Sequence, residues 1–197
     1  ASHRCGAAVR AACCGMMEAA SLDDGLLRLQ IDLPPHARRQ AAAYLELLAR
    51  WNRVYRLTAV ADPTAAVARH LLDSLAIVPF VHGPSLLDVG SGGGMPGIPL
   101  AIARPQLMVT LLDSSAKKAA FLRQAVIELG LANVAVHCGR VEAYQPQGRF
   151  AMISTRAFAS LAAIVRVSRH LLQADGCWLA MKGEWPRAEI AELPPGV

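Results

Sequence analysis

The 197-residue sequence predicts an α/β fold, in which a mainly parallel, doubly wound sheet follows an N-terminal helical region. Three observations support this prediction. Short apolar segments alternate with helical segments from residue 84 onward, one strand runs directly into a glycine cluster and then a helix, and the preceding residues have helical periodicity. Hydrophobic residues make up 54% of the chain and charged residues 18%, so it can bury a core and is not intrinsically disordered.

The first part of the chain is predicted to be helical. Residues 1–16 are rich in Ala and Cys without a regular period, and we expect a non-native or disordered leader there. Between residues 36 and 57 the apolar side chains recur every three or four positions, which predicts an amphipathic helix. Asp62 and Pro63 then supply a cap and a first-turn proline for a second helix. We therefore assign residues 17–83 to an N-terminal helical region.

Residues 84–197 are predicted to contain the sheet. Right-handed crossovers between parallel strands place the connecting helices on both of its faces. Five apolar runs are the predicted strands, at Ser85–Val89, Leu107–Leu112, Val134–His137, Phe150–Ser154 and Cys177–Met181. The predicted helices lie between them, at Gly97–Ala103, Ser115–Leu129 and Leu161–Leu172.

Charge and cysteine content narrow the classes of function. Lys and Arg number 20 against 15 Asp and Glu, and the net charge of +5 favours an anionic partner such as nucleic acid, although such an excess is also common among proteins that bind none. The five cysteines form no C-x-x-C pair and the six histidines no H-x-x-x-H pair, so we predict neither a disulfide framework nor a metal site. Without a membrane-spanning run or a signal peptide, a cytoplasmic protein is expected.

The segment LLDVGSGGGMPG, residues 86–97, is the most informative part of the sequence. It joins a strand to a helix through a cluster of glycines, whose missing Cβ atoms let a ligand approach the backbone closely. The following helix directs its positive end at the same place. A tight turn needs one or two glycines, whereas this segment has four within five positions, at 90, 92, 93 and 94. We therefore interpret it as a ligand-binding loop.

Two kinds of ligand fit this loop at the level of sequence. Gly92, Gly94 and Gly97 satisfy G-x-G-x-x-G, the dinucleotide pattern. Asp88 and Pro96 argue against a pyrophosphate, because the carboxylate would repel it and the proline removes a backbone donor. The pattern D-x-G-x-G-x-G resembles the first motif of class I S-adenosylmethionine-dependent methyltransferases, whose ligand carries an ammonium and a sulfonium group in place of phosphates.

A second acid stands where a nucleoside could be held. The second predicted strand ends at Asp113, 25 residues beyond Asp88, and a carboxylate there can accept hydrogen bonds from both ribose hydroxyls. The alternative is a helix cap before Ser115, and the two roles can coexist. A dehydrogenase would also require Tyr-x-x-x-Lys, but the fourth position after each tyrosine is Leu48, Ala59 or Gly148.

Several segments together resemble the RsmG (GidB) family of bacterial small-subunit ribosomal RNA methyltransferases, which methylate guanine at N7. The resemblance implies a Rossmann-like class I methyltransferase fold for residues 84–197, S-adenosyl-L-methionine as cofactor, and 16S ribosomal RNA or the small ribosomal subunit as partner. The matching segments are WNRVYRLT (51–58), RHLLDS (69–74), LLDVGSGGGMPGIPLAI (86–102), LLDSSAKKAAFLRQ (111–124), RVE (140–142), STRAFASL (154–161) and MKG (181–183).

The resemblance also implies a set of cofactor-binding residues. Alternatives remain for two of them: Val141 could simply pack in the core, and Arg156 could form an ion pair or bind either the methionine carboxylate or a target phosphate. No catalytic residue is assigned, because guanine N7 has a lone pair and no proton to lose. Asp113, the acid at the end of the second predicted strand, is added to this set. The predicted cofactor-binding residues are then Gly90, Met95, Asp113, Val141, Glu142 and Arg156.

Cationic side chains are candidates for contact with RNA. Arg39, Arg50 and Arg53 fall on one side of the predicted helix 36–57, and Lys182 follows the last predicted strand. A solvated, arginine-rich helix face is the alternative for the first three, and an ordinary surface lysine for the fourth. We expect a monomer.

The sequence departs from the family pattern, which usually has Asp where Ala151 stands, at two further points, and two rival functions remain. The family usually has Asn where Arg56 stands, and its members continue for a few tens of residues as a terminal β-hairpin, so we expect the C-terminal strands to be missing. The rivals are an S-adenosylmethionine-binding protein without transfer activity and a small-molecule methyltransferase.

Overall fold

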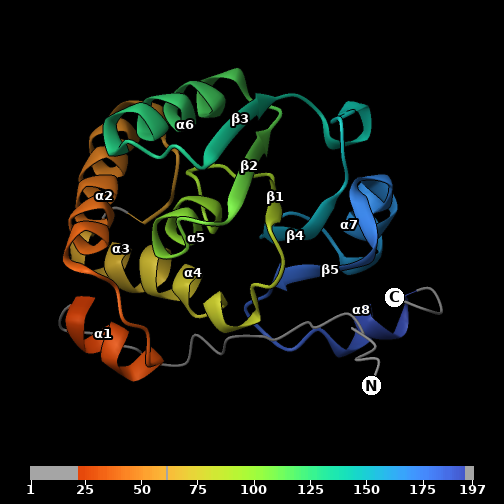
Figure 1. The fold of residues 1–197 in the computed structure, drawn as a ribbon, viewed down its shortest axis with the longest axis horizontal. Helices are drawn as coiled ribbons and strands as arrows, with labels where there is room; N and C mark the ends of the chain where they lie inside the picture. The colour runs from red at the N-terminus through yellow and green to blue at the C-terminus, as the bar shows by residue number, and fades with distance from the viewer. Residues whose placement is uncertain (1–21, 61, 194–197) are drawn as a thin grey trace.

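A five-stranded parallel sheet lies at the centre of the computed structural model, which describes residues 22–60 and 62–193 (Figure 1). The strand order is β3-β2-β1-β4-β5, and all four neighbouring pairs are parallel. The five predicted strands are therefore confirmed. Their bounds are β1 (Ser85–Val89), β2 (Met108–Asp113), β3 (Val134–Cys138), β4 (Phe150–Arg156) and β5 (Leu172–Met181).

The strand order creates a reversal point between β1 and β4. The chain runs outward from β1 through β2 to β3, and then returns to the other side of β1 to form β4 and β5. The two connections that leave the C-terminal ends of β1 and β4 therefore diverge, and open α/β sheets bind ligands in the crevice that this leaves. Asp88 of β1 lies opposite Ser154 of β4 in the register, one or two residues before the ends of these strands.

Helices cover both faces of the sheet, as predicted. On one face lie α5 (Gly97–Ala103) and α6 (Ala116–Leu129), and α2 (Pro35–Tyr55) packs against both of these helices. On the other face lies α7 (Leu161–Ser168) (Figure 1). Local chemistry sets the ends of α6. The Ser115 hydroxyl accepts a hydrogen bond from the Lys118 amide at 3.5 Å, and Gly130 ends the helix with a positive φ of 62°.

The N-terminal helices share one hydrophobic core with the sheet. Leu26, Tyr44 and Leu72 belong to the same buried cluster as Leu86 of β1 and Phe121 of α6. The predicted second helix is broken into three pieces, with a π-helical segment in the middle, and the sequence pattern did not reveal the short first helix. These elements are α1 (Leu22–Leu29), α3 (Pro63–Ala66), the π-helix η1 (Val67–Leu72), α4 (Asp73–Leu75) and the 3-10 turn η2 (Val78–Phe80).

The last part of the sheet differs from the prediction. The predicted helix 161–172 ends at Ser168, because a 3-10 turn and then β5 follow, and β5 begins five residues earlier than the apolar run at Cys177. Phe150 pairs with Leu172 and Met152 with Cys177, so β5 bulges between these two pairs. A short helix, α8 (Arg187–Ala191), comes after β5.

Two further points concern the predicted leader at the start of the chain and membrane-spanning helices. The leader predicted at residues 1–16 lies outside the described residues. Within the described parts of the chain, no helix is both long enough and apolar enough to cross a membrane.

The residue that ends α2 allows a stability test. Arg56 adopts the left-handed conformation, with φ 52° and ψ 55°, and a side chain in that conformation costs about 1 kcal/mol unless it is glycine or asparagine. We expect Arg56→Asn to raise the free energy of unfolding in urea by about 0.5–1 kcal/mol. The control is Arg53→Asn, inside the same helix, which should lower it by about 0.5 kcal/mol. Equal changes in both variants would contradict this account.

Candidate functional site

A cavity of about 280 Å³ opens at the C-terminal edge of the sheet. It lies where β1, β2 and β4 end, at the reversal point of the strand order. Such a position and size suit a small-molecule ligand. The cavity is lined by Val89, Gly90, Leu112, Asp113, Ser114, Lys118, Gly139, Arg140, Val141, Glu142, Arg156, Ala157 and Phe158.

Asp88 anchors the glycine loop from behind. Its carboxylate is fully buried, accepting a hydrogen bond from the Ser154 hydroxyl at 2.9 Å and one from the Gly97 amide at 3.2 Å. Burial raises the pKa of Asp88 to about 6, although these hydrogen bonds favour the charged form. The Asp88 carboxylate lies under the loop and does not line the cavity, so it would oppose a pyrophosphate through its charge and not by contact.

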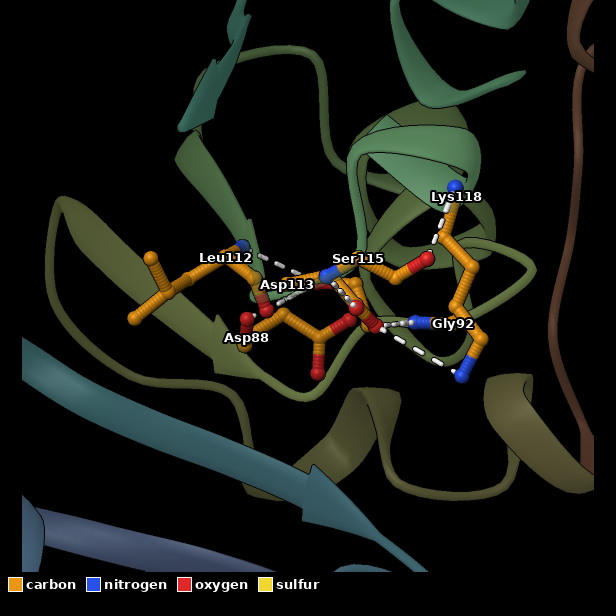
Figure 2. A network of polar contacts seen from close by, with 7 residues as sticks. Asp88, Gly92, Leu112, Asp113, Ser115 and Lys118 are labelled. Atoms are coloured by element: carbon orange, nitrogen blue, oxygen red, sulfur yellow. Dashed lines mark hydrogen bonds and ion pairs between the residues drawn. The ribbon is translucent and has the colours of Figure 1, made fainter. Parts of the chain in front are cut away.

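Asp113 connects the glycine loop to the start of α6, as Figure 2 shows. One carboxylate oxygen accepts the Gly92 amide at 2.9 Å, and the other accepts the Ser115 amide at 2.9 Å. The Lys118 ammonium lies 3.9 Å from the first oxygen. Asp113 therefore supports the first turn of α6, although the cap itself is Ser115. Its position on the cavity wall leaves the predicted ribose contact open.

The glycines of the loop serve different purposes. Only Gly90 lines the cavity, where a Cβ atom would lie 2.5 Å from the Phe158 ring. Gly94 and Gly97 are needed for packing, since a Cβ atom there would meet Ile98 or Leu111 within 2.5 Å. The loop as a whole was predicted to admit a ligand, and the structure restricts close approach at the cavity wall to Gly90.

Tyr44 of α2 supports the loop from the N-terminal helical region. Its hydroxyl donates a hydrogen bond to the Gly93 carbonyl at 2.6 Å, and both residues are buried. Burial raises the pKa of the Tyr44 phenol, so it stays protonated and remains a donor. The loop that borders the cavity is thus held by Asp88 of the sheet, Asp113 and this tyrosine.

Removing the Tyr44 hydroxyl should destabilise the protein. Tyr44→Phe leaves the buried Gly93 carbonyl without its donor, and we expect the free energy of unfolding in urea to fall by about 1–3 kcal/mol. Tyr55→Phe is the matched control, because that side chain is 39% exposed and contributes ring contacts. A loss of the same size in both variants would mean that the Gly93 contact does not matter.

Arg156 lies at the end of β4, where four groups surround its guanidinium. Nη1 donates to the Arg69 carbonyl at 2.8 Å and to Asp73 Oδ2 at 3.3 Å. Nη2 donates to Met95 Sδ at 3.2 Å and lies 3.5 Å from His70 Nδ1. The structure thus brings together two predicted cofactor residues, Arg156 on the cavity wall and Met95, a buried residue of the glycine loop that does not line the cavity.

The loop after β3 supplies the remaining predicted cofactor residues. Val141 is buried and packs with the α7 side of the core, yet it also lines the cavity, so both proposed roles are compatible. Glu142 is exposed on the same wall. In the described part of the chain, no three His, Cys, Asp or Glu side chains are grouped closely enough to hold a metal ion.

The four cationic side chains predicted to bind RNA differ in whether they already form ion pairs within the protein. Arg39 and Arg53 are exposed on α2, whereas Arg50 pairs with Glu128 of α6 at 3.0 Å. The Lys182 ammonium donates to the Ala159 carbonyl at 2.7 Å and pairs with Glu189 of α8. Two of the four predicted cations are therefore already engaged within the protein.

Sequence reasoning missed several residues of the site. Lys118, Arg140 and Phe158 line the cavity. The first two could have been found from their places in the segments after the second and third strands, since loops at that edge of the sheet all face the ligand crevice. His70 belongs to the matching segment RHLLDS, but only the fold brings it from η1 to the end of β4.

Comparison with known proteins gives a consistent result. A family model described as rRNA small subunit methyltransferase G (GidB) matches residues 37–195. The ribosomal RNA small subunit methyltransferase G of Laribacter hongkongensis is 53% identical over 176 residues, which cover 89% of this chain and 85% of that protein. The protein of the same name from Chromobacterium violaceum is 52% identical over 182 residues, which cover 92% of this chain and 87% of that protein.

Solved structures agree on the fold. A crystal structure of coclaurine N-methyltransferase, bound to N-methylheliamine and SAH, is 15% identical, with a TM-score of 0.50 over 81% of this chain and 57% of that chain. The Escherichia coli protein YjhP is 16% identical, with a TM-score of 0.50 over 68% of this chain and 54% of that chain. The fold is the Rossmann-like class I methyltransferase fold that the resemblance implied.

Proposed function

This chain belongs to the rRNA small subunit methyltransferase G family, and from that premise we propose that it transfers a methyl group from S-adenosyl-L-methionine to N7 of a guanine in 16S ribosomal RNA. The observation that carries the proposal is the cavity at the reversal point of the sheet. There the backbone of Gly90, the carboxylate of Asp113 and three cationic side chains face one space. Its walls suit a small nucleoside, and its cationic rim suits a polyanion.

The residues of the cavity fit S-adenosylmethionine. Each Asp113 oxygen accepts one hydrogen bond from the protein and has a further lone pair for a ribose hydroxyl. Val141 offers an apolar wall for the base, and Arg156 suits a carboxylate. The pKa of the buried Asp88 carboxylate is about 6, so this group is largely ionised at neutral pH. Its negative charge lies under the glycine loop and would attract a cationic ligand in the cavity.

The chain's own residues perform binding and orientation. When bound, S-adenosylmethionine supplies an activated methyl group for in-line displacement. Asp113 orients the nucleoside, and Gly90 allows close approach to the backbone. Guanine N7 attacks with its own lone pair, so no side chain has to remove a proton. The proposal accordingly assigns no general base.

The RNA is proposed to reach the site across cationic surface. Arg140 is exposed on the wall of the cavity, and Arg53 lies near the end of α2 on the side of the sheet where α6 begins. Arg39 is 14 residues earlier, about 21 Å away along the helix. Such spacing suits contacts with a backbone of phosphates rather than with a single base. A monomer in the cytoplasm, where bacterial ribosomal RNA is modified, is part of the same proposal.

A methyl-transfer assay tests the function directly. The chain is incubated with tritiated S-adenosylmethionine and either naked 16S RNA or small ribosomal subunits, and the labelled nucleoside is identified by mass spectrometry. We expect 7-methylguanosine in RNA. Cofactor binding without label in any RNA would support the rival binding protein, and label in a low-molecular-weight extract alone would support the small-molecule methyltransferase.

Charge reversal on α2 tests the RNA surface. We expect Arg39→Glu with Arg53→Glu to weaken RNA binding at least tenfold and to reduce the slope of log K against log salt by about 1.5–2, because two phosphate contacts are lost. Affinity for the cofactor should not change. The control is Arg149→Glu with Arg169→Glu, which makes the same change in charge at exposed positions away from α2. Equal effects from both pairs would refute a specific role for α2.

A further inference from the structure

The Arg156 guanidinium is held unequally on its two sides. Nη1 donates to a backbone carbonyl, that of Arg69, at 2.8 Å and to the carboxylate of Asp73 at 3.3 Å. Nη2 has a thioether sulfur, Met95 Sδ, at 3.2 Å and an imidazole nitrogen, His70 Nδ1, at 3.5 Å. Thioether sulfur is a weak acceptor and 3.5 Å is a long contact, so Nη1 is anchored and Nη2 is easily exchanged.

The ring of His70 lies between two polar groups. Its Nδ1 faces the Arg156 guanidinium, which only donates, and its Nε2 lies 2.9 Å from the Thr58 hydroxyl, so a neutral ring with the proton on Nε2 would satisfy both contacts. Burial, together with the charge of Arg156, lowers the pKa of His70 to about 4. The Thr58 amide in turn donates to Asn52 Oδ1 at 2.8 Å, which connects this contact to α2.

The local backbone explains how these groups reach the end of β4. Val67–Leu72 is π-helical, and Asp73 immediately follows it. The wider π turn presents the Arg69 carbonyl, the His70 ring and the Asp73 carboxylate together to one side chain of the sheet. π-helical turns are uncommon and are frequent at functional sites. His70 and Asp73, two side chains of the segment RHLLDS to which the proposed function assigns no role, both lie in this contact.

We propose that Asp73 is a positioning residue, which anchors Arg156 through Nη1 so that Nη2 can exchange Met95 and His70 for the carboxylate of the methionine part of the cofactor. This inference rests on the proposed function. The side chains of Arg156 and Asp73 are only 21% and 22% exposed, so their pairing is shielded from solvent and the guanidinium has little freedom to turn. An anchored donor loses less entropy when it binds its ligand.

The proposal is tested by calorimetric measurement of the affinity for two ligands, one with the amino-acid carboxylate and one without it. S-adenosylhomocysteine contains the amino-acid carboxylate, whereas 5′-methylthioadenosine has the same nucleoside and a thioether without it. We expect Asp73→Asn to weaken S-adenosylhomocysteine binding about tenfold and to change methylthioadenosine binding less than twofold. In an Arg156→Gln background the same substitution should have almost no further effect, because the group that it positions is gone.

Matched variants separate positioning from damage to the fold. Ser168→Ala removes buried hydrogen bonds with Ile164 and Trp178 on the opposite face of the sheet, and it should lower stability without changing the ratio of the two affinities. If Asp73→Asn does not fold, Asp73→Glu keeps the charge but displaces the guanidinium, and a selective loss of about threefold for S-adenosylhomocysteine is expected.

Several outcomes would overturn the inference. Equal losses for both ligands would make Asp73 a purely structural residue, and unchanged S-adenosylhomocysteine affinity with weaker RNA binding would assign Arg156 to a phosphate. Equal affinity of the wild-type chain for both ligands would exclude a carboxylate contact while leaving the methyltransferase function intact. Failure of the wild-type chain to bind either ligand would remove the proposed function and this inference together.

Discussion

Gly90→Val is expected to reduce affinity for S-adenosylhomocysteine by at least about 100-fold, which corresponds to about 2.7 kcal/mol of binding free energy. Two effects combine. Gly90 has φ +70°, a conformation that a β-branched residue adopts only under strain, and a Cβ atom there would lie 2.5 Å from Phe158 Cδ2. The added side chain would also stand on the wall of the cavity. Titration calorimetry measures the loss, and circular dichroism checks that the fold is retained.

Gly92→Val separates strain from obstruction. Gly92 also has a positive φ, of 57°, yet the nearest atom to a Cβ there is the Gly90 carbonyl oxygen at 3.7 Å, and Gly92 does not line the cavity. This variant should lose stability with a change in affinity of only a few fold. Equal loss of affinity in both variants would show that backbone strain in the loop, and not occupation of the cavity, controls binding.

Asp88→Asn is expected to make the protein much more sensitive to acid. The pKa of Asp88 is raised from 3.8 to about 6, so the folded state holds its proton more tightly than the unfolded state. Its contribution to stability is therefore fully present below pH 3.8 and is lost as the pH rises through about 6, a change of about 3 kcal/mol. The substitution removes this gain on acidification.

His70 has the opposite effect over nearly the same pH range. Its pKa is lowered from 6.5 to about 4, so its contribution is present above pH 6.5 and is lost as the pH falls through about 4, again about 3 kcal/mol. In the wild-type protein the two effects offset each other between pH 4 and 6. In Asp88→Asn only the histidine remains, and the free energy of unfolding should fall about 3 kcal/mol further on acidification than in the wild type.

The measurement is urea unfolding at a series of pH values from 4 to 7, for the wild type, Asp88→Asn, His70→Gln and the double variant. His70→Gln should become more stable relative to the wild type as the pH falls. The double variant should show the same pH dependence as the wild type, because the two contributions that offset each other in the wild type are both removed. Parallel curves for all four proteins would show that neither group titrates differently in the folded and unfolded states.

Much of the fold was accessible from the sequence because local patterns determine it. Alternating apolar runs and helical segments located all five strands and the helices Gly97–Ala103 and Ser115–Leu129, the latter correct to one residue. The segment LLDVGSGGGMPG located the loop that borders the cavity, since glycines permit the positive φ angles that this loop adopts at Gly90, Gly92 and Gly94. Period and composition do not reveal a π-helix, however, so the segmented helix between Pro63 and Leu75 was predicted as continuous.

Part of the candidate site was not predicted from the sequence, for one reason. Sequence places residues near the ends of strands but does not say which way each side chain points. Asp88 was recognised as a charge at the end of its strand, but not as a side chain buried under the loop, and the sequence did not reveal that Arg50 pairs with Glu128. Ser74 likewise lies in the matching segment RHLLDS, yet its side chain is fully buried and its hydroxyl donates to the His70 carbonyl.

By itself, the sequence determined the succession of strands and helices along the chain, the glycine loop that borders the cavity, and the family. Each of these is encoded in short segments of consecutive residues. Only the tertiary structure decided which carboxylate borders the cavity and what holds the arginine at the end of β4. The pairing of Arg156 with Asp73 joins residues 83 positions apart, and Tyr44 reaches Gly93 across 49. Such contacts form because packing the N-terminal helices against the sheet buries their apolar faces in a common core, and no local pattern encodes their polar partners.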